Sequence, residues 1–375
     1  MTADRTAAHP TSLSTLFTGA SVVVTGHTGF KGSWLSIWLA QLGARVTGIS
    51  QEVPTTPSHF AAARLDGMLT DVRVDIRDAA ALRAAVAAAR PDFVFHLAAQ
   101  PLVRRAYADP LEAWQTNVMG TVHMLEALRA LSHPTTAVFI TSDKAYDNVE
   151  WEWGYRETDA LGGGDPYSAS KGGAELAIQS YVRSYFPHDG AIRLAVGRAG
   201  NVIGGGDWAA DRIVPDCVRA WTRGERVQLR KPNATRPWQH VLEPLSGYLA
   251  LAAALHRDRH HHGEPYNFGP PAEQNHSVAE LVTEMAKHWD QVQWDDVSTT
   301  DDGPHESKLL KLNCDKALHR LHWRAVWPFR ETVGATAQWY RRYTEHAAAG
   351  MLPVSQEQIA TYVAAARAAG LAWAS

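Results

Sequence analysis

The chain has 375 residues, 45% of them hydrophobic, and a formal net charge of -3 at pH 7. This length can bury a large core and predicts one large or two coupled domains. The balanced charge argues against a nucleic-acid-binding protein, and no apolar run is long enough to predict a membrane-spanning helix. The chain has only two cysteines, Cys217 and Cys314, so we expect no framework of disulfide bonds. This number fits a reducing compartment, and we therefore expect a cytoplasmic protein.

The first part of the chain contains a strand, a glycine-rich turn and a helix in immediate succession. Residues 1–18 are polar and predict a loose leader. Ser21–Thr25 is an apolar run that predicts a buried parallel strand, and 33–42 has the apolar spacing of a helix. A tight turn alone would also need glycine, but the flanking elements favour a dinucleotide site. The expected cofactor contacts are Gly26, Thr28, Gly29, Phe30, Lys31 and Gly32.

The second strand, Arg45–Ile49, precedes the position where an acidic residue usually binds the adenosine ribose. Ser50 and Gln51 occupy that position, and Glu52 follows. The signal is ambiguous. No arginine is present there for a 2′-phosphate, so NAD is favoured over NADP.

Further strands follow at 70–74, 93–97 and 137–140, and a sixth at 192–198, with helical segments between them. Alternating strands and helices predict an α/β fold with a Rossmann-type doubly wound parallel sheet. Ligands bind at the carboxyl ends of such strands. The residues at these ends include Asp75, Ile76, Leu97, Ala98, Ala99 and Gln100, and Thr116 lies on a long helix predicted over 109–131.

The fifth strand is followed by Ser142, Asp143 and Lys144, and the next helix contains Tyr167 and Lys171. Tyr167 and Lys171 are four residues apart and share one helix face. An ammonium beside a phenol favours the phenolate, so we expect Lys171 to lower the pKa of Tyr167 from its usual value of about 10. Such a phenolate can remove a proton from a sugar hydroxyl.

The composition changes after residue 200. A glycine-rich loop is followed by basic and aromatic residues, which predict a smaller domain that closes over an anionic substrate. We expect 19–200 and 241–268 to form the dinucleotide-binding domain, and 201–240 and 269–375 to form the substrate-binding domain with a helical C-terminal tail. The histidine-rich run at 259–262 could bind a metal, but a solvated loop is favoured there; no metal-ligand spacing is found elsewhere, and we expect no metal. The basic and aromatic residues that follow the glycine-rich loop are Arg212, Arg230, Lys231, Arg236, Trp238 and His240.

Seven stretches together resemble the CDP-glucose 4,6-dehydratase family, in the extended branch of the short-chain dehydrogenase/reductase superfamily. The Ser-Asp-Lys and Arg-Pro-Trp-Gln-His sequences discriminate this family, whereas the glycine and Tyr/Lys motifs identify only the superfamily. The stretches span 25–34, 96–105, 141–144, 153–157, 165–171, 198–208 and 235–240.

The resemblance implies a three-stage reaction of CDP-glucose with tightly held NAD. Hydride leaves C4 while Tyr167 takes the hydroxyl proton, water is lost across C5 and C6, and hydride returns to C6. Lys171 would bind the nicotinamide ribose, Ser142 would bind the C4 oxygen, and Asp143, if burial keeps it protonated, would protonate the departing C6 hydroxyl. Asp75 would meet the adenine. The substrate-binding candidates are Arg105, Asn201, Arg212, Arg236 and His240, and a homodimer or homotetramer is implied.

Lys144 occupies the position where dTDP- and GDP-sugar dehydratases carry glutamate, the presumed C5 base. Either Lys144 is desolvated enough to be neutral, or it stabilises the enolate while another group takes the proton. An ordinary ion pair between Asp143 and Lys144 is the structural alternative.

Two other functions use the same superfamily motifs. A nucleotide-sugar 4-epimerase or decarboxylase would share the Tyr/Lys oxidation but would not need Asp143 and Lys144. A catalytically silent Rossmann protein that senses NAD and binds a partner would not need Ser142, Tyr167 or Lys171.

Overall fold

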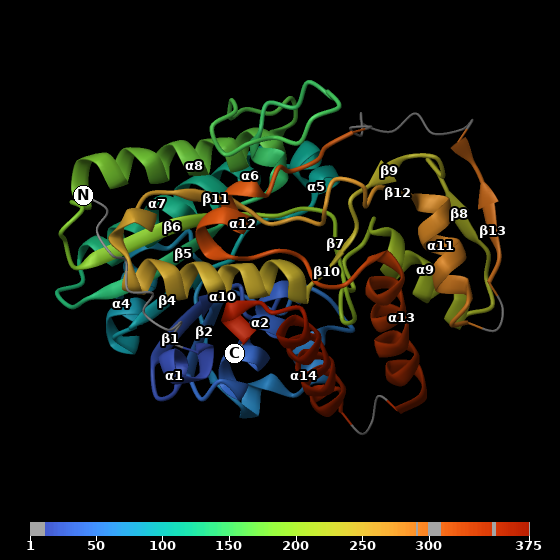
Figure 1. Cartoon of the computed structure of the whole chain (residues 1–375), viewed down its shortest axis with the longest axis horizontal. Coiled ribbons are helices and arrows are strands. Elements are labelled where there is room, and N and C mark those ends of the chain that lie inside the picture. Colours follow the sequence, from blue (N-terminus) through green and yellow to red (C-terminus); the bar gives the residue numbers. More distant parts are fainter. Residues whose placement is uncertain (1–11, 290–291, 299–308, 347–349, 375) are drawn as a thin grey trace.

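The computed structural model describes residues 12–289, 292–298, 309–346 and 350–374. Its centre is a seven-stranded sheet in the order β11-β6-β5-β4-β1-β2-β3, and every neighbouring pair is parallel (Figure 1). The predicted doubly wound α/β sheet is therefore confirmed. The strands are β1 (Ser21–Thr25), β2 (Arg45–Ser50), β3 (Thr70–Arg73), β4 (Phe93–His96), β5 (Thr135–Ile140), β6 (Ile192–Arg198) and β11 (Pro265–Asn267).

Helices cover both faces of this sheet, because its central strands are apolar throughout and need two buried faces. The side chains of β4 and β5 are all buried. One layer contains α4 (Ala79–Ala89), α7 (Gly120–Arg129) and α8 (Pro166–Tyr185), which pack in that order, and the other contains α2 (Phe30–Gln41) and α10 (Leu242–Arg257). A separate hydrophobic core lies on each face.

The predicted strand positions agree with the structure to within about two residues, and two helices differ. The helix expected from residue 33 begins at Phe30, inside the glycine turn. The long helix expected over 109–131 is divided into α6 (Pro110–Trp114), a π-helical turn η2 (Gln115–Met119) and α7. The π turn carries Asn117, whose amide is used by the site described below.

The prediction of a loose leader is wrong for residues 12–18. Ser12 caps a short helix, α1 (Leu13–Phe17), by accepting a hydrogen bond from the Thr15 N–H. Phe17 is fully buried and its ring packs on Phe93 at 4.9 Å. The remaining part of the predicted leader, 1–11, lies outside the described residues.

The segments after residue 200 build a smaller part at the right of Figure 1, made of short strand pairs and helices. The pairs are β7 with β10, β9 with β12, and β8 with β13. We propose, as the sequence suggested, that this part forms the substrate-binding domain. The elements are β7 (Val202–Ile203), β8 (Val227–Leu229), β9 (Thr235–Arg236), β10 (Gln239–His240), β12 (His276–Ser277), β13 (Trp294–Asp296), α9 (Ile213–Thr222), α11 (Val278–Ala286) and α13 (Phe329–His346). Helix α12 (Asp315–Leu321) instead packs on α10 and β11 of the large sheet layer (Figure 1).

The C-terminal helix α14 (Leu352–Ala368) packs on α2 of the dinucleotide-binding part. Its Tyr362 ring lies against Trp38 of α2 at 5.9 Å. The C-terminal tail is therefore helical, and it contacts the large sheet layer. Other short elements are α3 (His59–Ala62), η1 (Leu65–Gly67), α5 (Val103–Ala108), η3 (Asp143–Ala145), η4 (Arg259–His261) and η7 (Ala372–Ala374).

A buried carboxylate, Glu243, connects α10 to the C-terminal segments. It accepts hydrogen bonds from the Val326 and Trp327 N–H groups at 3.0 and 2.7 Å and from the Tyr362 hydroxyl at 2.6 Å. Burial raises its pKa from 4.5 to about 7, and these hydrogen bonds oppose the rise. A carboxyl with a raised folded-state pKa stabilises the protein below its unfolded pKa, and this contribution is lost as the pH rises through the folded value.

Glu243→Gln should therefore flatten the pH dependence of stability. Wild-type protein should lose about 1–3 kcal/mol of unfolding free energy relative to this variant between about pH 5 and pH 8. Urea unfolding at both pH values measures it, and Glu357→Gln on the exposed face of α14 is the control. Parallel pH profiles for wild type and Glu243→Gln would contradict the assignment.

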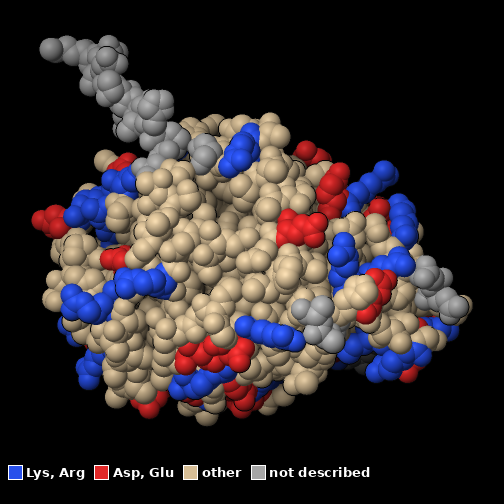
Figure 2. Space-filling view, turned by 90° about the horizontal axis from the view of Figure 1, so that it is seen from below, with Lys and Arg blue, Asp and Glu red and all other residues tan. Residues whose placement is uncertain are grey.

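The surface agrees with the balanced composition. On the face drawn in Figure 2, basic and acidic side chains are mixed around a broad uncharged centre, without one continuous basic patch. Among the described helices, none has the length and apolar character needed to cross a bilayer.

Candidate active site

The carboxyl end of β5 delivers three side chains to one corner. The chain leaves β5 at Ile140 and forms the 3-10 turn η3, in which the Ser142 hydroxyl caps the Lys144 N–H at 3.2 Å. Ser142 and Asp143 are 6% and 5% exposed, and Lys144 is half-buried. The predicted Ser142–Asp143–Lys144 corner is therefore a folded unit, set by a side-chain cap.

Asp143 is held by neighbours on both carboxylate oxygens. Its Oδ1 accepts from the Ser142 hydroxyl at 2.9 Å, and its Oδ2 accepts from the Asn201 amide at 3.3 Å. Among the described residues no ion pair joins Asp143 to Lys144, so the two side chains are not an ordinary pair of opposite charges at the strand end.

Tyr167 and Lys171 lie on α8, which begins at the Asp165 cap with Pro166 in its first turn. Both are buried, at 8% and 6% exposure. Burial raises the pKa of Tyr167 to about 12, and the hydrogen bond with Ser142 opposes this rise. Burial lowers the pKa of Lys171 to about 8, opposed by Glu175.

The expectation that Lys171 lowers the pKa of Tyr167 is not met by the chain itself. Desolvation penalises the charged form of each group, and its effect on the phenol exceeds that of the hydrogen bond from Ser142. The charge that opposes the rise in the pKa of Tyr167 is that of Arg212, whereas the charges of Asp143 and Asp165 add to it. A further positive charge beside the Tyr167 ring would be needed to lower the pKa of the phenol towards neutral pH.

A fully buried ion pair fixes the base of this corner. Arg198, the last residue of β6, donates to Glu175 of α8 at 2.7 Å, and both side chains are 1% exposed. Glu175 also accepts from the Thr141 hydroxyl at 2.6 Å, and Arg198 donates to the Tyr146 hydroxyl at 2.6 Å. The pair therefore ties β5, β6 and α8 together within one turn of Lys171.

The glycine turn after β1 has the shape that a dinucleotide requires. Gly26 has φ +75°, and a Cβ at Gly32 would lie 2.1 Å from the Gly26 carbonyl oxygen, so neither position accepts a side chain. Gly29 caps α2 without a side-chain hydrogen bond, which leaves the N–H groups of the first turn directed out of the helix end. These features fit the diphosphate of a dinucleotide.

The other predicted cofactor positions lie around the same edge of the sheet. Leu97, Ala98 and Ala99 follow β4 and are half-buried. The backbone of Gln100 is held by the Asn117 amide, which bonds the Gln100 N–H and C=O at 2.8 and 3.1 Å and the Ser170 hydroxyl at 2.8 Å. Asn117 therefore connects this strand end to α8. The remaining members, Thr28, Phe30, Ile76 and Thr116, are buried or half-buried at this edge.

Two residues near the position expected for the adenosine already contact other side chains of the protein. The Asp75 carboxylate pairs with Arg77 at 2.7 Å on its own turn. Ser50, which stands where an acidic residue was expected, contacts the His27 ring at 2.9 Å, and the other His27 nitrogen contacts Asp71 at 3.0 Å. This buried His27 contact was not predicted from the sequence.

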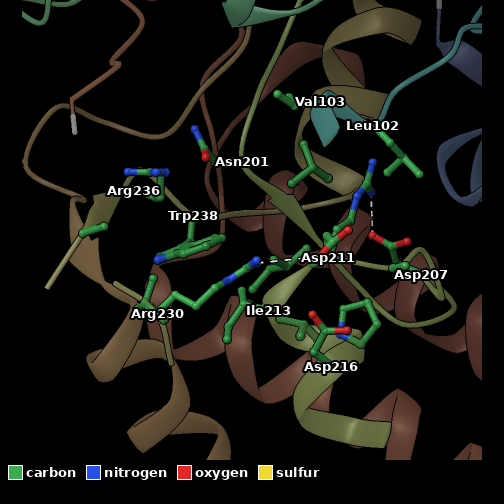
Figure 3. Close-up of a pocket in the computed structure, with 18 of the residues that line it drawn as sticks. Leu102, Val103, Asn201, Asp207, Asp211, Ile213, Asp216, Arg230, Arg236 and Trp238 are labelled. Atoms are coloured by element: carbon green, nitrogen blue, oxygen red, sulfur yellow. Dashed lines mark hydrogen bonds and ion pairs between the residues drawn. The ribbon is translucent and has the colours of Figure 1, made fainter. Parts of the chain in front are cut away.

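A pocket of about 690 Å³ opens beside the catalytic corner and continues into the smaller part. Ser142, Asp143, Lys144 and Tyr167 line it at one end. Lys31 also lines it, and burial, followed by the charge of Arg212, lowers the pKa of Lys31 to about 8. In Figure 3, one side of the pocket carries Arg230, Arg236 and Trp238, and Leu102 and Val103 lie across from them.

Three predicted substrate residues line this pocket. Asn201 has φ +53° and donates to Asp143, and Arg212 pairs with Asp207 at 2.6 Å. Arg236 lies on β9 and donates to its neighbour's carbonyl at 2.8 Å. The lining of the pocket therefore includes the two predicted arginines, Arg212 and Arg236.

The assignment of Arg105 to the substrate is not supported. Arg105 is 56% exposed, pairs with Glu112 at 2.5 Å and is absent from the pocket lining. Arg104, the preceding residue, lines the pocket instead and lies 3.8 Å from Asp211. The two positions differ by about 100° around α5, which the sequence alone could not orient.

The assignment of His240 to the substrate also needs correction. Its ring is fully buried between Trp34 and Trp327, at centroid distances of 6.1 and 4.9 Å, and burial lowers its pKa to about 3. His240 is therefore part of the core under the pocket. Its neighbour Gln239 faces the catalytic corner, because successive residues of a strand point to opposite sides.

Comparisons with known proteins place the chain among nucleotide-sugar dehydratases. The family model described as GDP-mannose 4,6 dehydratase matches residues 23–336. A CDP-glucose 4,6-dehydratase of Salmonella typhimurium is 46% identical over 354 residues, which cover 92% of this chain and 97% of that protein. A dTDP-glucose 4,6-dehydratase of Streptomyces antibioticus is 30% identical over 86% of this chain and 92% of its own length.

Solved structures show the same fold at lower identity. The dTDP-glucose 4,6-dehydratase of Bacillus anthracis, in complex with NAD, aligns with a TM-score of 0.71 at 21% identity over 86% of this chain and 97% of its own. The UDP-glucose-4-epimerase of Stenotrophomonas maltophila, with bound NAD, aligns with a TM-score of 0.75 at 22% identity over 87% and 99%. The sequence matches, together with the catalytic corner, show that the chain belongs to the CDP-glucose 4,6-dehydratase family of the short-chain dehydrogenase/reductase superfamily and is a hydro-lyase.

Proposed function

We propose that the chain converts CDP-D-glucose to CDP-4-keto-6-deoxy-D-glucose and water, with NAD as its cofactor. The observation that carries the proposal is that Ser142, Asp143, Lys144 and Tyr167 line one pocket. An epimerase would use the tyrosine and serine, but it would have no chemistry for Asp143 and Lys144. The 46% identity to a CDP-glucose 4,6-dehydratase supports the same choice.

The residues that would hold NAD are those of the glycine turn and the strand ends described above, with Lys171 at the nicotinamide ribose. NAD, when bound, accepts the C4 hydride and later returns it to C6, and its oxidised ring carries a positive charge. That charge would oppose the effect of burial on Tyr167, whose pKa the chain alone raises to about 12.

In the first stage Tyr167 takes the proton of the C4 hydroxyl. Ser142, which lines the same pocket as Tyr167, would bind the C4 oxygen and hold it near the phenol. Both side chains come from rigid elements, the end of β5 and the first turn of α8, so their relative position is fixed before substrate binds.

In the second stage the 4-keto group acidifies the C5 proton, and the C6 hydroxyl leaves as water. Asp143 would supply the proton that the hydroxyl takes. Lys144 would act in the same step, either as a neutral amine that takes the C5 proton or as an ammonium that stabilises the enolate.

The diphosphate would bind the arginines of the pocket. Arg236 is the candidate by its position in the Arg-Pro-Trp-Gln-His stretch, and Arg104 and Arg212 line the same pocket. Guanidinium groups bind phosphate oxygens bidentately, which favours them for this task. The nucleotide would then extend towards Trp238 and Arg230.

A homodimer is also proposed, from an apolar surface on α6, η2 and α8. Four large apolar side chains there are more than two-fifths exposed, and exposed apolar surface of this kind marks an interface. Sedimentation equilibrium measures the oligomeric state, and a monomer at micromolar concentration would contradict the proposed homodimer. The side chains are Leu111, Trp114, Met119 and Leu176.

The free cysteines Cys217 and Cys314 support a reducing, cytoplasmic location.

A panel of CDP-, dTDP-, GDP- and UDP-glucose tests the function. We expect a 4-keto-6-deoxy product, scored by its absorbance in alkali, from CDP-glucose in preference to the other three. A product that keeps its C6 hydroxyl would indicate the epimerase, and efficient turnover of another nucleotide would change the substrate.

Asp143→Asn should separate the first stage from the second. Asparagine keeps the shape and the Ser142 contact but cannot protonate the leaving hydroxyl, so water loss should fall by about 10²–10⁴-fold. NADH absorbance should still appear on mixing, because C4 oxidation does not use Asp143. Loss of both signals in a folded variant would contradict the assigned role.

A further inference from the structure

Asp211 lies between two arginines that come from different parts of the chain. Its Oδ1 atom is 3.8 Å from the Nε atom of Arg104 on α5 and 3.8 Å from the Nη2 atom of Arg230, which follows β8. Figure 3 shows Asp211 and Arg230 together in the pocket beside the catalytic corner, and Arg104 lines the same pocket. One carboxylate oxygen is therefore shared by a cation of the dinucleotide-binding part and a cation of the smaller part.

These two contacts are looser than the ion pair of Arg212 with Asp207 in the same pocket, which has hydrogen-bond length at 2.6 Å. The side chains of Arg104, Arg230 and Asp211 are 40%, 34% and 49% exposed, so solvent screens the attraction between them. Within the part of the chain that the structure describes, neither Arg104 nor Arg230 forms a second ion pair. Both guanidinium groups therefore keep donors that a ligand can use.

The position of Asp211 depends on these two arginines. Its φ is +60°, a left-handed conformation that aspartate and asparagine adopt more readily than most other residues. A second carboxyl, Asp216, lies nearby: burial raises the pKa of Asp216, the charge of Asp211 adds to the rise, and Arg219 and Arg230 oppose it. Asp211 is thus repelled by one neighbour and attracted by two exposed cations, so an anion that binds these cations more strongly can displace it.

A diphosphate is such an anion. It carries more negative charge than a carboxylate, and its several non-bridging oxygens can accept from guanidinium groups at full hydrogen-bond length. Exposed ion pairs contribute little, so the loss of the two 3.8 Å contacts costs little in return. In the proposed reaction both the substrate and the product carry a diphosphate.

We infer that Asp211 is a counter-charge that competes with the substrate: its carboxylate lies between Arg104 and Arg230 and is displaced by the diphosphate of the nucleotide sugar. The inference rests on the proposed function, in which the substrate carries this group. Asp211 takes no part in bond making or breaking. It therefore sets the affinity for the diphosphate, in the ground state and the transition state alike, and a change of its charge should alter KM rather than the chemical step.

Asp211→Asn tests the inference, because asparagine keeps the shape and adopts the same backbone conformation but carries no charge. In titration calorimetry of the NAD-loaded protein, the Kd of CDP should fall by about 3–10-fold, and the KM of CDP-glucose should fall by a similar factor. C4 oxidation at saturating substrate, followed by NADH absorbance, should stay within about twofold of wild type. Cytidine, which has no phosphate, should bind both proteins equally. An unchanged or raised Kd of CDP would overturn the inference and show a structural role only.

Asp295→Asn is the matched control. Asp295 is also in the smaller part, is 46% exposed and pairs with one arginine, Arg226, at 2.6 Å, but it does not line the pocket. This variant loses the same charge and should bind CDP within about twofold of wild type. An equal gain of affinity in Asp295→Asn and Asp211→Asn would overturn the inference, because net charge alone would then explain both.

The two arginines provide a test that is independent of any single variant. Arg104→Met and Arg230→Met should each weaken CDP binding by about tenfold, because each removes charge-assisted hydrogen bonds to the diphosphate. In either background, Asp211→Asn should give a smaller gain of affinity than it gives in the wild-type protein, since one of the two competing contacts is already absent. The full gain in both backgrounds would show that Asp211 does not act through these arginines.

Inorganic pyrophosphate separates this test from the test of the proposed function, because it has neither base nor sugar. It should bind Asp211→Asn more tightly than wild type, whichever nucleotide sugar the enzyme uses. Wild-type protein that forms no 4-keto-6-deoxy product from CDP-glucose refutes the function. Wild-type protein that forms this product, with an Asp211→Asn variant that binds CDP and pyrophosphate no more tightly, refutes the inference alone.

Discussion

Tyr167→Phe should lower turnover of CDP-glucose by about 10²–10⁴-fold, the range expected when a general base is removed. The variant keeps the ring, which packs in a small cluster with Ala106 and Ala113, so the fold should be unchanged. NADH absorbance should not appear on mixing, because removal of the C4 hydroxyl proton is the first step. Single-turnover absorbance and steady-state product formation measure the effect.

The matched control is Tyr181→Phe on the same helix. Tyr181 is half-buried and near Glu126, away from the pocket lining, so its variant should keep wild-type turnover. Binding of NAD to Tyr167→Phe, followed by protein fluorescence, should remain within about tenfold of wild type. Wild-type oxidation in the Tyr167 variant would show that another group takes the proton.

Arg198→Met should lower the free energy of unfolding by about 3–5 kcal/mol, because it leaves Glu175 as an unpaired charge in the interior. Arg198 is 1% exposed and bonds Glu175, the Tyr146 hydroxyl and the Glu157 carbonyl. Replacing Arg198 removes the hydrogen bonds that join the end of β6 to Glu175 of α8, to Tyr146 and to Glu157 near the catalytic corner. Urea unfolding at neutral pH measures the change.

The double variant Arg198→Met with Glu175→Leu separates charge from packing. Replacing both partners removes the unpaired charge, so the double variant should be more stable than Arg198→Met alone. Stability costs that simply add would contradict the account of the buried pair. Turnover should fall in the double variant, because Thr141 loses the Glu175 carboxylate that accepts its hydroxyl and Lys171 loses the nearby negative charge of Glu175.

The parts of the fold that the sequence predicted are those with local patterns. The apolar run at Ser21–Thr25, the glycines after it and the Asp165 cap of α8 act within a few residues, so each could be read before the structure. The same holds for Ser142, Asp143 and Lys144, which follow a strand whose carboxyl end lies at the ligand edge of a parallel sheet.

The parts that the sequence missed depend on contacts between distant segments. Arg104 and Arg105 are adjacent, and the pairing of Arg105 with Glu112 decides which one faces the pocket. His240 and Gln239 alternate across β10, and the packing of Trp34 and Trp327 decides that the histidine lies in the core.

The pKa of Tyr167 was missed for a related reason. The four-residue spacing places Lys171 on the same face, but it carries no information about desolvation, which raises the pKa of the phenol to about 12. Burial is a property of the folded chain, and so is the position of any charge that opposes it.

The transfer of deuterium from C4 tests the central claim most directly. CDP-glucose labelled with deuterium at C4 should give a 4-keto-6-deoxy product with that deuterium at C6, within the same molecule, because one pocket performs both hydride transfers. Mass and NMR spectra of the product locate the label. Deuterium returned to C4, or lost to solvent while a 6-deoxy product forms, would contradict oxidation, water loss and hydride return at a single site.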